Sequence, residues 1–232
     1  MNLQLITTAD GSHSIYVKEL DEHYHSIHGA IQEALHVFIN TGLKYLHLKK
    51  YARINILEVG FGTGLNTLLT FIEAEKLNIH VNYTSLEAFP LEKNMLDSLN
   101  YVELISGLYK EDQAFIRSKY KQVHTCEWEK QIKLSDYFTL HKIKNTLQEV
   151  KFESTFDLIF FDAFGPRVQP EMWSEELFSK IYESTNSNGC LVTYCAKGEV
   201  KRSLKKVGFL VETLPGPPRK REMVRGTKDK SP

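Results

Sequence analysis

A short apolar run that stops at three closely spaced glycines most constrains the fold of this chain. Residues 54–59 include β-branched side chains, as buried parallel strands do, and Gly60, Gly62 and Gly64 follow at every second position. Glycine permits positive φ angles and a close approach of the backbone to a ligand. Leu65 opens a segment with helical spacing, so the loop leads to a helix N-terminus whose free N–H groups suit an anion. The sequence therefore predicts a strand–loop–helix unit that binds a ligand.

The spacing of the glycines separates two classes of cofactor. Enzymes that bind NAD use G-x-G-x-x-G at this place, whereas this loop is G-x-G-x-G and closes early at Thr63-Gly64. Glu58 also stands in the strand just before the loop, where its carboxylate could face an ammonium group. Both details favour S-adenosylmethionine, whose carboxylate suits the helix N-terminus. The residues predicted to hold the cofactor are Glu58, Gly60, Phe61, Gly62, Thr63, Gly64 and Asn66. The alternative is a purely structural turn in which Glu58 is exposed to solvent.

Strands and helices alternate along the rest of the chain. The first 18 residues predict a β-hairpin that turns at Asp10-Gly11, and a helical segment follows from residue 30 and ends at Gly42. Further elements are expected as strands at 81–87, 131–134, 156–161 and 189–194, and as helices over most of 90–122, at 174–184 and at 199–207. Residues 209–214 and 222–226 predict a closing antiparallel pair. This order predicts an α/β, Rossmann-like fold with a mostly parallel sheet and a terminal antiparallel hairpin.

The element order also suggests how the chain is organised. Residues 1–50 are expected to form an N-terminal hairpin and helix packed on the core, residues 51–226 the main domain, and residues 227–232 a frayed tail. The formal net charge is zero, the N-terminus has no secretion signal, and no apolar run is long enough to cross a bilayer. Three cysteines without a C-x-x-C pair fit reduced thiols, so a cytoplasmic protein is expected.

Ligands of open α/β sheets bind beyond the carboxyl ends of the strands, and the predicted strands end in polar residues. The second strand ends in Glu87, which is placed to accept hydrogen bonds from ribose hydroxyls. The third ends in Ser135-Asp136, and the Asp136 carboxylate is predicted to accept a bond from the adenine amine, to cap a helix, or both. These two carboxylates complete the expected cofactor site.

The fourth strand ends in a loop, residues 162–166, that combines an acid, an aromatic ring and a proline. This combination is similar to the loop with which amine-directed nucleic-acid methyltransferases hold their target. An alkylamine is mostly protonated at neutral pH, so the Asp162 carboxylate could take its proton or orient its lone pair. Phe164 could stack on a base or contact a cationic centre. Asp162 and Phe164 are therefore the catalytic candidates, and Asp162 is also expected to contact the cofactor. The alternative is that this loop is an ordinary structural turn.

Charge and histidine clusters indicate what else the chain could bind. Residues 197–232 hold eleven Lys or Arg against four Asp or Glu, which suggests a polyanionic partner or a solvated surface. Within this segment Arg219, Lys220 and Arg221 follow a stiff Gly-Pro-Pro turn and are the predicted RNA-binding residues. His23, His25 and His28 have no matching ligands at metal spacing, so no metal is expected.

With these pieces in view, most of the chain resembles the methyltransferase module of the enzymes that make 5-methylaminomethyl-2-thiouridine at the tRNA wobble position. The segments that carry the resemblance are 21–38, 58–66, 85–91, 161–173 and 216–226. The second and fourth segments, together with the Arg-Lys-Arg-Glu-Met ending of the last, are specific to that family. The sequence near Asp136 departs from the Gly-Asp of the family.

The resemblance implies a function. It implies that S-adenosylmethionine methylates the nitrogen of 5-aminomethyl-2-thiouridine in the tRNA anticodon stem-loop. In that family the module is often fused to a flavin-dependent oxidase, and nothing in these residues resembles the oxidase. A stand-alone form, which receives its aminomethyl base from upstream modification enzymes, is therefore expected. The alternatives are a small-molecule amine methyltransferase, such as a relative of the polyamine synthases, and a noncatalytic tRNA-binding protein on the same fold.

Overall fold

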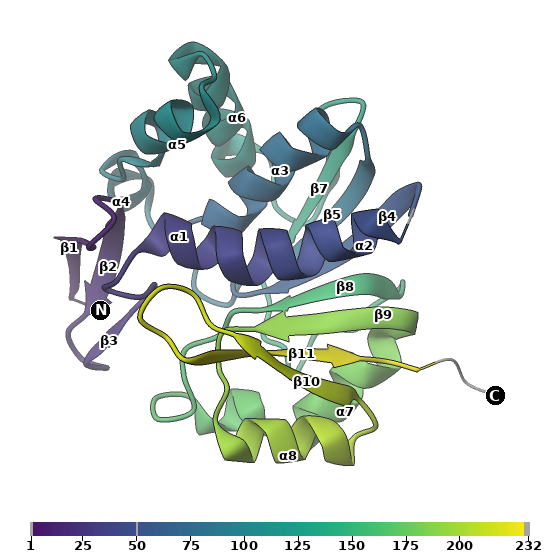
Figure 1. The fold of residues 1–232 in the computed structure, drawn as a ribbon. Helices are drawn as coiled ribbons and strands as arrows, with labels where there is room; N and C mark the ends of the chain where they lie inside the picture. The colour runs from purple at the N-terminus through teal and green to yellow at the C-terminus, as the bar shows by residue number, and fades with distance from the viewer. Residues whose placement is uncertain (1, 50, 230–232) are drawn as a thin grey trace.

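The computed structural model describes residues 2–49 and 51–229, and a twisted sheet runs through the centre of this part (Figure 1). The strands lie in the order β10-β11-β9-β8-β4-β5-β7-β6. Their bounds are β4 Arg53–Val59, β5 His80–Leu86, β6 Gln131–Lys133, β7 Phe138–Ile143, β8 Phe156–Phe161, β9 Thr185–Thr193, β10 Leu210–Pro215 and β11 Glu222–Thr227. The central strands β9, β8, β4, β5 and β7 are parallel, whereas β6 at one edge and the β10–β11 hairpin at the other are antiparallel. The predicted fold class and the terminal hairpin are confirmed.

Helices cover both faces of the sheet, because buried parallel strands are apolar on both sides. One face carries a long helix and α3, and the other carries α7 and α8 (Figure 1). The helical bounds are α1 Ala30–Ala34, the π-helix η1 Leu35–Leu43, α2 Lys44–Leu48, α3 Leu65–Leu77, α4 Lys93–Asp97, α5 Tyr101–Tyr109, α6 Gln113–Thr125, the 3-10 helix η2 Pro170–Trp173, α7 Glu175–Ser184 and α8 Gly198–Lys206. Two buried hydrophobic clusters result, one under each helical layer.

The N-terminal segment forms the predicted hairpin and one further strand. β1 (Leu3–Thr7) pairs with β2 (His13–Val17), and β2 pairs with the short β3 (Glu22–His23), all antiparallel. Asp10 in the turn accepts hydrogen bonds from the N–H of Ser12, at 3.0 Å, and of Gln32, at 3.0 Å. The carboxylate thereby ties the turn to the first helix.

The helix that follows is longer than predicted. The helical backbone does not end at Gly42 but runs on through η1 into α2, one continuous helix in Figure 1. Gly42 lies against the sheet: an added Cβ would come within 3.0 Å of Phe160 Cε1 and 3.2 Å of Val192 Cγ2. This glycine therefore allows close packing of the helix on the sheet, and it does not end the helix.

The predicted frayed tail is also wrong in part. Thr227 pairs with Cys190 in the sheet, and the N–H of Lys228 donates to the Gly189 carbonyl at 2.9 Å. The Lys228 ammonium donates to the carbonyls of Tyr182 and Thr185, each at 2.8 Å. Residues 230–232 of that predicted tail lie outside the described residues.

Candidate active site

A cavity of about 960 Å³ opens beyond the carboxyl ends of the parallel strands, where ligands of such sheets bind. It is within the size range of small-molecule sites. Most of the predicted site residues line it: Gly60, Phe61, Gly62, Thr63, Asn66, Glu87, Asp162, Phe164, Arg219 and Lys220. Glu58, Gly64, Asp136 and Arg221 do not. The cavity therefore brings together residues from both termini and from the middle of the chain.

The glycine loop connects β4 to α3 in the conformation that the sequence predicts. Gly60, Gly62 and Gly64 all have positive φ, at 97°, 49° and 71°. At Gly60 an added Cβ would lie 2.7 Å from the Asp162 carbonyl oxygen, so only glycine fits between the ends of β4 and β8. The N–H of Gly62 donates to Glu87 Oε2 at 2.9 Å. Glu87 thus borders the cavity and holds the loop at the same time.

Glu58 is fully buried behind the cavity wall and does not line the cavity, so the structure does not support the predicted direct contact of its carboxylate with the cofactor ammonium. Its side chain points under α3, where Oε2 accepts hydrogen bonds from the hydroxyls of Thr67 at 2.9 Å and Ser85 at 2.5 Å. Burial raises the pKa of this carboxyl to about 8, although both hydroxyls lower it. The period of two along β4 explains this, because residue 58 lies on the same face of the sheet as residues 54 and 56, which pack with α3.

Asp136 lies at the opposite edge of the sheet from the cavity. The predicted strand before it, β6, runs antiparallel to β7, so its carboxyl end meets the amino ends of the parallel strands. The Asp136 carbonyl contacts His80 Nδ1 at 3.0 Å at the start of β5, and its exposed carboxylate pairs with Lys133 at 2.7 Å. The predicted adenine contact of Asp136 is therefore wrong.

The strand that occupies the predicted position is β7, which was not predicted from the sequence. Asn145 and Thr146 follow its carboxyl end and line the cavity. The period-two burial of β7, with Phe138, Leu140 and Lys142 inward, was the available signal. Lys142 obscured it, since a lysine is seldom buried. Here its ammonium donates to the Val123 carbonyl at 2.9 Å and lies 4.8 Å from the Trp128 ring centroid.

Asp162 follows β8 directly and is partly buried at the cavity wall. The Asn66 amide donates to Asp162 Oδ2 at 2.8 Å, which leaves the buried Asn66 Oδ1 without a partner among the described residues. Burial, and to a smaller extent the charge of Glu33, raise the pKa of Asp162 to about 7, although the Asn66 hydrogen bond and Lys220 act to lower it. A carboxyl with this pKa is partly ionised near neutral pH, and its ionised form can accept a proton from an amine.

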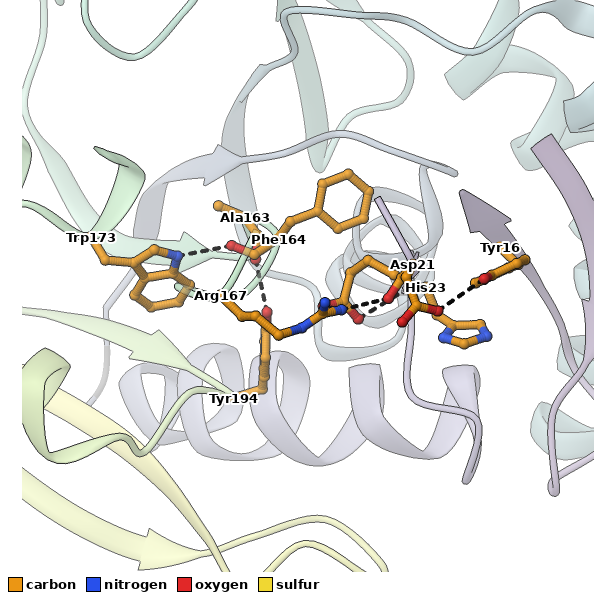
Figure 2. A network of polar contacts seen from close by, with 9 residues as sticks. Tyr16, Asp21, His23, Ala163, Phe164, Arg167, Trp173 and Tyr194 are labelled. Atoms are coloured by element: carbon orange, nitrogen blue, oxygen red, sulfur yellow. Dashed lines mark hydrogen bonds and ion pairs between the residues drawn. The ribbon is translucent and has the colours of Figure 1, made fainter. Parts of the chain in front are cut away.

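The loop after Asp162 is held from three sides, as Figure 2 shows. Tyr194 donates its hydroxyl to the Ala163 carbonyl at 2.9 Å, and the Trp173 indole N–H donates to the Phe164 carbonyl at 2.8 Å. Arg167 donates to the Asp21 carbonyl at 2.5 Å and pairs with Glu22 at 3.3 Å. The backbone that positions Asp162 is therefore fixed by the residue that follows β9, by η2 and by the N-terminal segment together.

Tyr24 also lines the cavity and was not predicted from the sequence. Its ring packs on the glycine loop, since a Cβ added at Gly62 would lie 3.2 Å from Tyr24 Cδ1. The ring also meets Phe164 edge to face, with centroids 5.1 Å apart. Beside it, His25 Nε2 lies 3.4 Å from Thr63 Oγ1, and burial lowers the pKa of His25 to about 4. The sequence feature that could have indicated Tyr24 is segment 21–38, which contains this residue and carries part of the family resemblance.

The predicted basic segment divides into residues with different surroundings. Arg219 and Arg221 are exposed, and Arg219 lies at the cavity rim with a positive φ of 66°. Lys220 points inward instead: its ammonium pairs with the Glu33 carboxylate and lies 4.6 Å from the Tyr194 ring centroid. Lys220 is therefore a cavity residue, while the two arginines face solvent.

Three further findings concern metals, thiols and membranes. In the described part of the chain, no three His, Cys, Asp or Glu side chains are grouped so as to hold a metal ion. Cys126, Cys190 and Cys195 are free thiols. None of the helices within residues 2–49 and 51–229 has the length and apolar character needed to cross a membrane.

The cavity has features that suit S-adenosylmethionine. Backbone at Gly60 and Gly62 can approach a ligand with no Cβ in between, and α3 begins directly after the loop. Asn66 also lines the cavity, and its Oδ1 has no hydrogen-bond partner among the described residues. Glu87, Asn145 and Thr146 follow the next two parallel strands and add polar groups along the same edge.

Comparisons with known proteins agree with this geometry. Residues 105–229 match a family described as S-adenosyl-L-methionine-dependent methyltransferase. A curated relative from Idiomarina loihiensis, the tRNA 5-methylaminomethyl-2-thiouridine biosynthesis bifunctional protein MnmC, is 31% identical over 89% of this chain and 35% of its own length. The protein of that name from a Marinomonas species is 32% identical over 90% of this chain and 31% of its own. The chain thus spans about a third of these curated relatives.

Solved structures show similarity over the whole chain. The crystal structure of MnmC2 from Aquifex aeolicus superposes with a TM-score of 0.75 at 27% identity, covering 100% of this chain and 72% of that one. Spermidine synthase from Thermotoga maritima, at 12% identity and a TM-score of 0.56, shares the fold over 99% of this chain and 72% of its own. The family match covers more than half of the sequence and includes the loop that holds Asp162. This chain belongs to the S-adenosyl-L-methionine-dependent methyltransferases.

Proposed function

We propose that this protein methylates the aminomethyl nitrogen of 5-aminomethyl-2-thiouridine at the tRNA wobble position, giving 5-methylaminomethyl-2-thiouridine. The observation that carries the proposal is the Asp162 carboxyl, which lies beside the glycine loop with a pKa raised to about 7. Relatives named for the biosynthesis of that nucleoside match about nine tenths of the chain, which supports this choice of acceptor.

Different residues of the cavity would have different roles in such a reaction. When bound, S-adenosylmethionine supplies an electrophilic methyl group that a nitrogen lone pair can attack. The amine must first lose a proton, and the ionised form of Asp162 can accept it at the oxygen not bonded to Asn66. Asn66 keeps the carboxyl in one orientation, so the proton is taken from a defined direction.

Aromatic side chains would hold the acceptor base and exclude water. The rings of Tyr24 and Phe164 meet edge to face next to Gly62, and both line the cavity. Such rings provide stacking surfaces for a nucleobase and a favourable face for a cation. Phe164 has its carbonyl fixed by Trp173, so its backbone does not have to be ordered on binding.

The proposal includes the partner and its origin. Arg219 at the cavity rim and the exposed Arg221, two residues further along the turn, carry positive charge that suits the phosphates of an anticodon stem-loop. An aminomethyl base has to be made before it can be methylated, so upstream modification enzymes must supply it. A cytoplasmic location follows from a tRNA substrate and is part of the same proposal.

Transfer of a radiolabelled methyl group tests the function. Purified protein and labelled S-adenosylmethionine are incubated with tRNA bearing the wobble aminomethyl group, with the same tRNA lacking it, and with free spermidine. Label is expected only in the first tRNA, at the wobble nucleoside after digestion. Label in spermidine but not in tRNA would favour a small-molecule amine methyltransferase. Binding of tRNA without any transfer would favour a noncatalytic protein, and either result overturns the proposal.

A further inference from the structure

A primary ammonium group already occupies one wall of the cavity. Lys220 pairs with the Glu33 carboxylate, and its ammonium lies 4.6 Å from the centroid of the Tyr194 ring. The Glu33 side chain is only 9% exposed and that of Lys220 28%. The ε-ammonium of lysine and a protonated aminomethyl substituent have the same chemistry, a compact –CH₂–NH₃⁺ group with three donors.

The two groups that hold this ammonium are anchored independently of Lys220. Glu33 lies in the first turn of its helix, and its Oε1 accepts a hydrogen bond from the Ser26 N–H at 3.1 Å. Tyr194 donates its hydroxyl to the Ala163 carbonyl, which keeps the ring in place. Lys220 instead comes from the turn between β10 and β11, and its side chain is more exposed than that of Glu33. The carboxylate and the ring would therefore stay if the lysine left.

This ammonium site lies next to the proposed proton acceptor. Glu33, Lys220, Tyr194 and Asp162 line the same cavity. Tyr194 bonds the residue that directly follows Asp162. The charge of Glu33 raises the pKa of Asp162, and the charge of Lys220 lowers it. Both charged groups therefore lie close enough to Asp162 to interact with it electrostatically.

We propose that Glu33 and the Tyr194 ring form the subsite for the protonated amine of the acceptor, and that Lys220 occupies this subsite until the acceptor displaces it. The inference rests on the proposed function and assigns the step before proton loss. The amine first binds Glu33 as an ammonium, and it then gives its proton to Asp162 in the same cavity.

The displacement has a consequence for selectivity. Exchanging one ammonium for another leaves Glu33 paired, but it leaves the displaced Lys220 without a counterion. A nucleic acid brings its own phosphates to the cavity rim, where Arg219 also lies, and these can pair with the released lysine. A free amine brings no anion, so the same exchange is less favourable for it. The ion pair therefore favours amines carried on a polyanion.

Chemical rescue tests the subsite without measuring activity. The Lys220→Ala variant leaves Glu33 unpaired, so ethylammonium chloride is expected to raise its thermal midpoint by about 2–4 °C over sodium chloride of equal ionic strength. No such rise is expected for the double variant Glu33→Gln with Lys220→Ala. A rise of equal size in both variants, or none in Lys220→Ala, would overturn the inference.

Acceptor binding tests the role of Glu33 on the RNA. Affinities are measured for an anticodon stem-loop with the aminomethyl group and for the same stem-loop with unmodified uridine. The wild type is expected to prefer the amine, and Glu33→Gln to reduce that preference by about 10- to 100-fold, as loss of a charge-assisted hydrogen bond does. Glu33→Asp should restore part of it.

Glu73→Gln is the matched control, because Glu73 is also buried and pairs with a lysine, Lys44, at 3.2 Å, but does not line the cavity. It should keep the full preference for the amine. A Glu33→Gln protein that still prefers the amine would contradict the subsite. The outcomes separate the two proposals: rescue by ethylammonium with no methylation of tRNA contradicts the function alone. Methylation of tRNA with no rescue contradicts the subsite alone.

Discussion

At the scale of single residues, the carboxyls of Asp162 and Glu58 both have raised pKa values but differ in their surroundings. Asp162 lines the cavity and accepts one hydrogen bond, from Asn66. Glu58 is enclosed beneath α3 and accepts two, from Thr67 and Ser85. Asp162 can therefore exchange a proton with a ligand, whereas the protonation state of Glu58 affects the stability of the protein.

Asp162→Asn is expected to slow methyl transfer by roughly 10²–10⁴-fold, the usual effect of losing one positioned proton acceptor. Cofactor affinity should change little, because asparagine keeps an oxygen that can accept from Asn66. Single-turnover rates and calorimetric titration of S-adenosylmethionine measure the two effects separately. If affinity and rate fell together, Asp162 would belong to the cofactor site or to the scaffold.

The pH dependence of the wild type provides a second measurement on this residue. Because burial raises the pKa of Asp162 to about 7, its ionised form is lost as the pH falls below about 7. The rate constant kcat/KM for tRNA is therefore expected to rise with pH through this range, with an inflection near 7. A profile that is flat between pH 6 and 8 would mean that no such group limits the reaction.

Glu58 should affect stability, with a predictable sign. The pKa of its folded-state carboxyl, about 8, exceeds the ordinary value of 4.5, so the folded protein holds this proton more tightly than the unfolded chain. Its contribution is complete below pH 4.5 and is lost as the pH rises to about 8. Glu58→Gln cannot ionise, so its free energy of unfolding relative to wild type should increase between pH 5 and pH 9. Urea denaturation at three pH values measures this, and a constant difference would contradict it.

At the scale of elements, the strand–loop–helix unit from β4 to α3 was predictable because its signals are local. The apolar run, the alternating glycines and the helical spacing all lie within residues 54–77. β7 was not predictable in the same way, because its buried Lys142 is stabilised by carbonyls and aromatic rings distant in sequence. The direction of β6 depends on its pairing with β7, and the error at Asp136 followed from missing that pair.

Gly62→Val is expected to abolish cofactor binding measured by calorimetry. A β-branched residue is strained at a φ of 49°, and its Cβ would lie 3.2 Å from Tyr24 Cδ1, so the side chain would enter the cavity. Gly107→Val in α5 is the control, since a Cβ there meets no atom within 4 Å. Normal cofactor binding by Gly62→Val would show that the loop does not contact the cofactor.

At the scale of the whole molecule, the cavity closes only because distant parts of the chain meet. Tyr24 and Glu33 come from the N-terminal segment, Asp162 from the middle, and Lys220 from the β10–β11 turn. Figure 1 shows this turn reaching past the start of α1. The long helix that carries Glu33 is held on the sheet by the close contact at Gly42. The two ends of the chain thus form one side of the site.

The exposed arginines of that turn should determine part of the RNA affinity. Exchanging Arg219 and Arg221 for glutamine is expected to weaken tRNA binding and to reduce the slope of log Kd against log salt by about 1–2, one for each lost phosphate contact. Lys220 is left unchanged, because it pairs inside the cavity. Cofactor affinity should stay the same.

The control for this double variant is Arg117→Gln with Lys121→Gln, which removes the same charge from exposed positions on α6, away from the turn (Figure 1). It should leave the salt slope near the wild-type value. Equal slopes in the wild type and the Arg219 and Arg221 variant would move the RNA contacts elsewhere on the protein.

The sequence by itself determined the features that depend on short segments. These are the order of most strands and helices, the positive φ of the glycine loop, and the position of Asp162 at the end of an apolar strand. Periodicity and glycine content decide such features locally, so no distant contact has to be known. The family resemblance also depends on contiguous motifs.

Only the tertiary structure decided which side chains share the cavity. Glu58 and Asp162 are both acids beside strand ends, yet strand alternation turns one under α3 and packing opens the other to the cavity. Lys220 and Arg221 are adjacent basic residues, but only Lys220 meets a buried carboxylate, 187 residues away in the chain. The physical reason is that ion pairing, burial and pKa depend on the surrounding charges and dielectric, which long-range packing creates.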